Sequence, residues 1–104
     1  MEEMVLIYVT NPSKEKALEV AKHLLDKRLV ACTNVISATS MYWWEGALEN
    51  ENEFILIAKT VEENFDSVRH EILEIHDYQI PCIIKIPVIA NQQYVQWLRS
   101  EIKT

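Results

Sequence analysis

Residues 29–44, "LVACTNVISATSMYWW", and residues 47–60, "ALENENEFILIAKT", are two strand-like stretches separated only by Glu45 and Gly46. A two-residue connection that contains Gly is a strong signal for a tight β-hairpin turn. Strands in globular proteins are typically about 5 to 6 residues long, so both arms are unusually long. The sequence therefore predicts one long hairpin in the middle of the chain.

The segments around the hairpin alternate between strand and helix patterns. Asn11 is the expected N-cap of a first helix, Thr60 and Glu63 form the capping-box pattern of a second, and Asn91 is the expected cap of a third. Pro87 cannot donate to a β-ladder, so the last strand ends there or lies at an edge. The predicted elements are a strand at 4–10, a helix at 11–28, the hairpin strands at 29–44 and 47–60, a helix at 60–76, a strand at 82–86 and a helix at 91–103.

This order predicts an α+β fold, a ferredoxin-like sandwich with an additional C-terminal helix. The apolar strand at 4–10 is expected to be central and covered on both faces. With 104 residues, of which 49% are hydrophobic, the chain is long enough for one core and too short for two. We expect a single domain spanning residues 1–104.

The charge balance argues against one class of partner. Ten Lys and Arg residues stand against sixteen Asp and Glu residues, for a formal net charge of −6. Nucleic-acid binding requires a basic surface, so neither nucleic acid nor an anionic membrane is an expected partner. No stretch resembles a signal peptide or approaches the roughly 20 apolar residues of a membrane span, so the expected location is cytoplasmic.

Three aromatic residues, Tyr42, Trp43 and Trp44, precede the turn of the hairpin. Because side chains alternate along a strand, Trp43 is expected on one face and the other two rings on the opposite face. A small open sandwich has helices on one sheet face only, so large rings on the other face need a partner to cover them. The hairpin is thus a candidate oligomer interface; the alternative is one ring in the core and the others on a solvated surface.

Four stretches resemble, in order and spacing, the successive signature blocks of the CutA family of divalent-cation tolerance proteins. They are "KRLVACTNVI" (27–36), "TSMYWWEGALENENEFILIAKT" (39–60), "HDYQIPCIIKIPV" (76–88) and "YVQWLRSEI" (94–102). The resemblance implies a ferredoxin-like fold, a tight homotrimer whose hairpins pair between subunits, and an architecture shared with PII-type signalling trimers. It also implies a response to metal ions, with copper or another divalent cation bound. The alternative is a PII-like sensor or scaffold that binds a small ligand or a protein between subunits.

His76 and Cys32 are the candidate metal ligands, because imidazole and thiolate are both suited to copper. A helix cap is the alternative role for His76, and a buried free thiol is the alternative for both Cys32 and Cys82. Some family members proposed to bind copper carry a Cys and a second His where this chain has Val9 and Ile75, so two of the three proposed ligands are missing here.

Trp44, Glu53, Lys59 and Tyr78 match family positions, which the resemblance places in clefts between subunits. Glu53 and Lys59 share a strand face, and a structural ion pair between them is the alternative to ligand binding. Glu49, Glu51 and Glu53 alternate onto that same face, either as a weak cation site or as a solvated acidic edge.

Catalysis is not expected. The chain has no Gly-rich phosphate loop and no Ser–His or Cys–His pair in a recognisable setting, and its single Gly lies in the hairpin turn.

Overall fold

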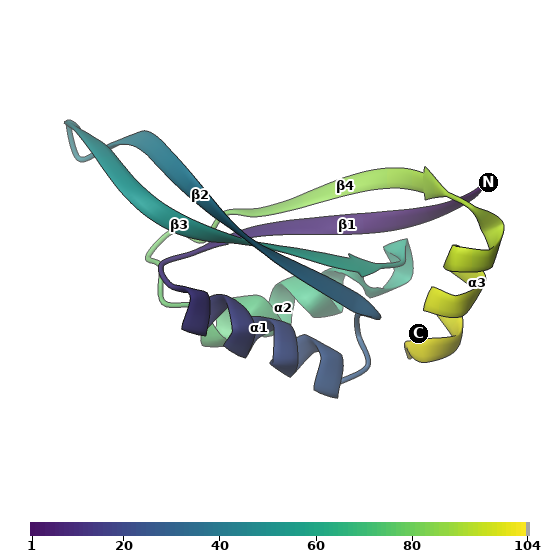
Figure 1. Cartoon of the computed structure of the whole chain (residues 1–104). Coiled ribbons are helices and arrows are strands. Elements are labelled where there is room, and N and C mark those ends of the chain that lie inside the picture. Colours follow the sequence, from purple (N-terminus) through teal and green to yellow (C-terminus); the bar gives the residue numbers. More distant parts are fainter. Residues whose placement is uncertain (104) are drawn as a thin grey trace.

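The computed structural model describes residues 1–103, and Thr104, the last residue of the expected domain, lies outside the described residues. The chain forms four strands and three α-helices, with a 3₁₀ turn before the second helix (Figure 1). In chain order these are β1 (Glu2–Asn11), α1 (Lys14–Asp26), β2 (Cys32–Trp44), β3 (Ala47–Thr60), η1 (Glu62–Asn64), α2 (Phe65–Ile75), β4 (Ile83–Ala90) and α3 (Gln92–Glu101).

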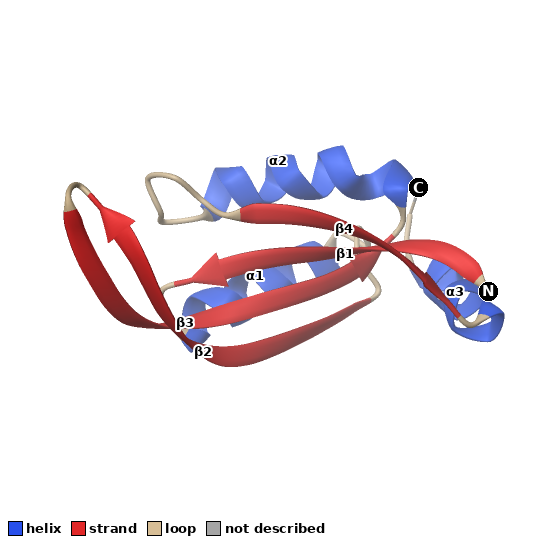
Figure 2. Cartoon of the chain, turned by 90° about the horizontal axis from the view of Figure 1, so that it is seen from above, coloured by secondary structure: helices blue, strands red, loops and turns tan. Residues whose placement is uncertain are grey.

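The strands form one antiparallel sheet in the order β2-β3-β1-β4. Helices α1 and α2 lie on the same side of this sheet, and α3 packs at the end of the sheet where the chain begins (Figures 1 and 2). The predicted ferredoxin-like arrangement with an extra C-terminal helix is confirmed. None of the helices within residues 1–103 is both long and apolar enough to cross a membrane.

The core lies between the sheet and the first two helices. Val5, Ile7 and Val9 point from β1 to that side and pack against residues such as Leu24 of α1 and Ile72 of α2. Side chains alternate along a strand, so the intervening residues of β1 face away from α1 and α2. Most of these are only half-buried, and α3 covers that face only near Met4. The prediction that β1 is central is confirmed, whereas coverage of both its faces holds only at one end.

The hairpin of β2 and β3 is the feature that distinguishes this fold. Its strands are 13 and 14 residues long and are joined by Glu45 and Gly46, whose φ angles are 48° and 81°. Positive φ at both positions is the type I′ geometry that matches the natural twist of a hairpin. The tip of the hairpin extends well beyond α1 and α2 (Figure 1).

Two expected helix starts are wrong. Asn11 ends β1 as a buried residue whose amide donates to the carbonyl oxygens of Val9 and Phe54, and the N-cap of α1 is Ser13. The capping box also does not form, because the Thr60 hydroxyl donates to the Leu29 carbonyl and the 3₁₀ turn η1 precedes α2.

The remaining expectations at the C-terminal end are largely confirmed. β4 lies at an edge of the sheet and continues through Pro87, which pairs in register with Val5. Asn91 is the N-cap residue of α3, although its side chain makes no capping hydrogen bond.

Candidate functional site

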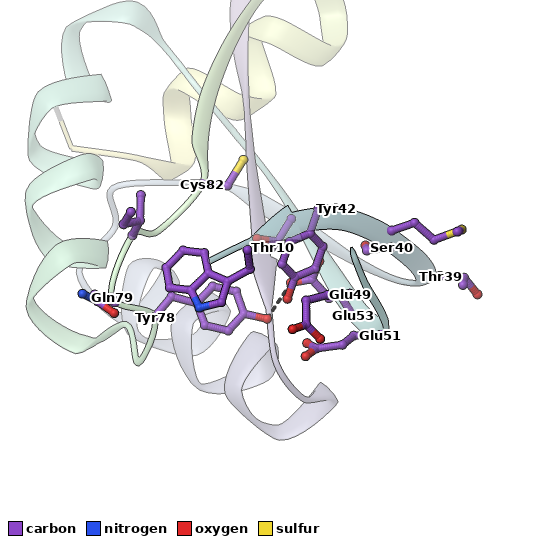
Figure 3. A pocket seen from close by; sticks show the side chains of 13 residues that line it. Thr10, Thr39, Ser40, Tyr42, Glu49, Glu51, Glu53, Tyr78, Gln79 and Cys82 are labelled. Carbon is purple, nitrogen blue, oxygen red and sulfur yellow. Dashed lines mark hydrogen bonds between the residues drawn. The ribbon is translucent and has the colours of Figure 1, made fainter. Parts of the chain in front are cut away.

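A pocket of about 770 Å³ lies between the projecting hairpin and the loop that connects α2 to β4. We call it the hairpin pocket, and Figure 3 shows the side chains that line it. They are Thr10, Thr39, Ser40, Met41, Tyr42, Trp44, Glu49, Glu51, Glu53, Tyr78, Gln79, Ile80 and Cys82.

The strand register of the hairpin explains why acidic and aromatic side chains meet in this pocket. Tyr42 pairs with Glu49, Ser40 with Glu51, and Ala38 with Glu53. Directly opposed residues of an antiparallel pair point to the same side of the sheet, and so do residues two positions apart on one strand. The three glutamates therefore share one face, as the sequence predicted, and the Tyr42 ring lies on that same face (Figure 3). Trp43 points to the opposite face and is 74% exposed.

Glu53 is the most buried acidic group of the pocket, with only 6% of its surface exposed. Its Oε2 atom accepts a hydrogen bond of 2.5 Å from the Tyr78 hydroxyl (Figure 3). Burial and this carboxyl neighbour together raise the pKa of Tyr78 well above its usual range, so the hydroxyl remains a neutral donor. Within residues 1–103, the other oxygen of Glu53 has no hydrogen-bond partner, and no Lys, Arg or His forms an ion pair with this side chain.

His76 holds the loop that carries Tyr78. It is the C-cap residue of α2, its Nε2 lies 2.7 Å from the Thr10 carbonyl oxygen, and its Nδ1 accepts from the Tyr78 backbone N–H at 3.1 Å. This pattern fits the tautomer with the proton on Nε2, because a carbonyl oxygen can only accept. Both ring nitrogens are engaged, so a metal ion at His76 would have to displace one of these hydrogen bonds.

The same loop carries two further polar side chains, Asp77 and Cys82. Asp77 forms an ion pair of 3.5 Å with Lys16. Cys82 lies just before β4 rather than within it, and it is only half-buried. Its partial burial and the nearby charge of Glu53 raise the pKa of the Cys82 thiol, which disfavours the thiolate that a metal would bind.

The structure of one chain does not bring His76 and Cys32 together. Cys32 pairs with Lys59 in the row of the sheet that contains Leu6, whereas the His76 ring contacts Thr10, four residues further along β1. At about 3.3 Å per residue this is a separation of about 13 Å. No three His, Cys, Asp or Glu side chains converge in a way that could hold a metal ion anywhere in residues 1–103.

Of the four residues expected to line a cleft, three meet in the hairpin pocket and one does not. Trp44, Glu53 and Tyr78 line the pocket. Lys59 shares their sheet face but lies near the other end of β3, where its Nζ atom is 5.5 Å from the centre of the Tyr94 ring. The alternative ion pair between Glu53 and Lys59 is therefore not formed, and Lys59 makes a cation–π contact with α3 instead.

Tyr42 and Thr10 are among the lining residues that the sequence analysis did not single out as pocket residues. The sequence analysis treated Tyr42 only as an aromatic residue of the hairpin, although its cross-strand pairing with Glu49 follows from the position of the turn. The Thr10 contribution depends on where the loop after α2 folds back, which local patterns do not encode.

Comparison with known proteins gives a consistent set of matches. The model of the family "CutA1 divalent ion tolerance protein" matches residues 5–101. A divalent-cation tolerance protein CutA of Archaeoglobus fulgidus is 41% identical over 98 residues, which cover 93% of this chain and 96% of the relative.

Solved structures give the same result. That of a periplasmic divalent cation tolerance protein CutA from A. fulgidus superposes with a TM-score of 0.93 at 40% identity, covering 96% of this chain and 99% of the other. CutA1 from Oryza sativa has a TM-score of 0.93 at 32% identity, covering 97% and 94%. The family description and the names of the A. fulgidus proteins refer to tolerance to divalent cations and not to a catalysed reaction.

Proposed function

Because the chain belongs to the CutA1 divalent ion tolerance protein family, we propose that it acts in the response of the cell to divalent metal ions. In this proposal the protein is a cytoplasmic homotrimer that binds copper or another divalent ion. The observation that carries this proposal is the similarity along almost the whole chain to proteins named for tolerance to divalent cations. One relative is called periplasmic, so fractionation of cells that express the protein tests the location independently.

Assembly into a trimer is supported by the distribution of exposed apolar side chains. Met41, Trp43 and Leu48 are exposed close to the turn of the hairpin, and Ile36 and Ile84 are exposed on the open face of the sheet. Large exposed apolar areas of this kind are typical of interfaces. A ring of three subunits would cover both surfaces and the free sheet edges at β2 and β4.

The metal proposal places copper at His76 and Cys32. Since these residues are separated within one chain, a site that uses both has to combine groups from two subunits. Copper on the Nδ1 atom of His76 would also release the Tyr78 backbone N–H, which couples metal binding to the loop of the hairpin pocket.

Calorimetric titration of the purified assembly with Cu²⁺ and Zn²⁺ tests this proposal. His76→Ala and Cys32→Ser should each weaken binding by about 10-fold or more, because removing even an indirect partner of a bound metal typically costs that much. His70→Ala is the matched control, since this side chain is exposed on α2. The Zn²⁺ arm avoids oxidation of the thiols by copper. Binding that is unchanged in both variants, or reduced equally in the control, contradicts the site.

We also propose that the protein is not an enzyme. The hairpin pocket combines the carboxyl groups of three glutamates with the hydroxyl of Tyr78, whose pKa is raised. Burial and the neighbouring Glu53 raise the pKa of the Tyr78 hydroxyl, which disfavours its phenolate as a nucleophile, and the raised pKa of Cys82 disfavours the thiolate of that side chain.

A second function, a PII-like sensor or scaffold that binds a small ligand between subunits, is favoured by the hairpin pocket itself. Its volume of about 770 Å³ lies within the range of small-molecule sites, about 300 to 1,000 Å³. A thermal-shift screen of inorganic anions, nucleotides, amines and metal ions tests it. A ligand that stabilises the wild type but not a variant with an altered pocket supports this function.

A further inference from the structure

The hairpin pocket has an unusual charge composition. Its lining includes three carboxyl groups, from Glu49, Glu51 and Glu53, and none of its lining residues is Lys, Arg or His. Three aromatic rings, from Tyr42, Trp44 and Tyr78, complete the walls. A cleft lined by charge of one sign concentrates ions of the opposite sign. The pocket is therefore suited to a cation and unsuited to a phosphate or a nucleotide.

The burial of Glu53 supplies a second indication. It is 6% exposed, Tyr78 satisfies only its Oε2 atom, and no cationic side chain within residues 1–103 pairs with it. A carboxylate can accept about four hydrogen bonds, and a buried charge is costly unless it is paired. Glu53 is thus a largely buried side chain that lacks a cationic partner, and its second oxygen, which makes no hydrogen bond within residues 1–103, can accept from a ligand in the pocket (Figure 3).

The arrangement of the carboxyl groups distinguishes between kinds of cation. Glu49, Glu51 and Glu53 occupy alternate positions of β3, so their attachment points are spaced at about 6 to 7 Å along the strand. They do not converge on one point, and no three-ligand metal cluster exists within residues 1–103. A row of separated carboxylates matches a ligand whose positive charges are themselves separated, rather than a single small ion.

From this geometry we propose that the hairpin pocket binds a linear aliphatic polyamine, with Glu53 accepting from a terminal ammonium group and Glu49 and Glu51 pairing with the ammonium groups that follow. The short alkyl segments between the nitrogens lie against the rings of Tyr42, Trp44 and Tyr78, which also attract cations through their faces. This inference rests on the second function, the binding of a small ligand in the pocket, and names the class of ligand.

Calorimetric titration of the assembled protein with spermidine at near-physiological ionic strength tests the inference. Loss of one charged hydrogen-bond partner should weaken binding roughly 10- to 100-fold, so we expect this change for Glu53→Gln, which keeps the shape of the side chain. Glu49→Gln/Glu51→Gln alters less buried positions and is the second variant, which keeps the test valid if Glu53→Gln disturbs folding. The control variant Glu15→Gln/Glu74→Gln also removes two negative charges, but from exposed positions of α1 and α2. It should bind spermidine as the wild type does.

Two results would overturn the inference. Equal weakening in the Glu15/Glu74 control would mean that spermidine is attracted only by net charge. Absence of binding to the wild type would mean that the pocket takes another ligand or that a Lys or Arg of a second copy neutralises Glu53. Parallel titrations with inorganic phosphate and Mg²⁺ separate these cases, because a pocket-dependent signal from either one leaves the second function intact and removes polyamines alone. If neither these titrations nor the thermal-shift screen finds a ligand, both the polyamine inference and the second function are overturned.

Discussion

At the scale of single residues, a short chain of hydrogen bonds links three separate parts of the fold. The His76 ring bridges the Thr10 carbonyl of β1 and the Tyr78 backbone, and the Tyr78 hydroxyl reaches Glu53 of β3. Each bond fixes the orientation of the next group, so the position of the buried carboxyl depends on the helix-capping histidine. The role of His76 visible in one chain is to position Tyr78.

The Tyr78 hydroxyl should make stability depend on pH in the alkaline range. Its pKa in the folded protein is raised above the ordinary value of 10.0, first by burial and then by Glu53. A group with a raised folded pKa contributes its stability fully below the unfolded pKa and loses it as pH rises toward the folded pKa. Above pH 10 the free energy of unfolding should therefore fall. Urea denaturation at several alkaline pH values should show a shallower fall for Tyr78→Phe; equal slopes would contradict this account.

Individual residues show which parts of the hairpin pocket the sequence predicts and which parts it does not. Two-residue alternation correctly placed Glu49, Glu51 and Glu53 on one face, since the period of a strand is a local property. The same rule put Lys59 on that face, but six residues along a strand correspond to about 20 Å, so a shared face did not mean contact. The hydrogen bonds of His76 depend on the fold of a loop, and no local pattern encodes them.

At the scale of elements, strand and turn signals were more informative than cap signals. The hairpin was predictable because long alternating strands and a Glu-Gly turn indicate the same structure. The expected caps at Asn11 and Thr60 failed because both side chains make tertiary hydrogen bonds instead, to Phe54 and Leu29 respectively. A polar residue before a helix has several possible partners, and only the folded chain determines which one it uses.

The caps that do form allow a direct comparison. The Ser13 hydroxyl accepts from the Lys16 N–H at 3.0 Å, whereas Asn91 makes no such bond at the start of α3. Ser13→Ala should lower the free energy of unfolding by about 1 kcal/mol, and Asn91→Ala should lower it by clearly less. Chemical denaturation of the two variants beside the wild type measures this difference. Similar losses would mean that the hydrogen bond is not the source of the stability at Ser13.

At the scale of the whole molecule, one chain has an extended shape with apolar side chains left in water. Its dimensions of 45 × 25 × 20 Å reflect the hairpin that extends past the helices. The α1 and α2 side of the sheet is closed by a complete core, whereas the hairpin and the open face of the sheet expose Trp43, Leu48 and Ile36. Apolar side chains are thus buried on one side of the sheet only. The apolar surfaces that stay exposed are those that the proposed trimer would cover.

Trp43 gives the sharpest test of that assembly. In one chain this ring is 74% exposed, so Trp43→Ala should cost an isolated subunit little stability. If three subunits enclose the ring, the same change removes a buried side chain from each of them, at about 3 to 5 kcal/mol per subunit. Sedimentation equilibrium at micromolar concentration should then show a trimer for the wild type and dissociation for the variant. Leu18→Ala is the control, because Leu18 is also exposed, at 48%, but lies on α1. A wild type that sediments as a folded monomer would refute the trimer, and the apolar hairpin would then require a different partner.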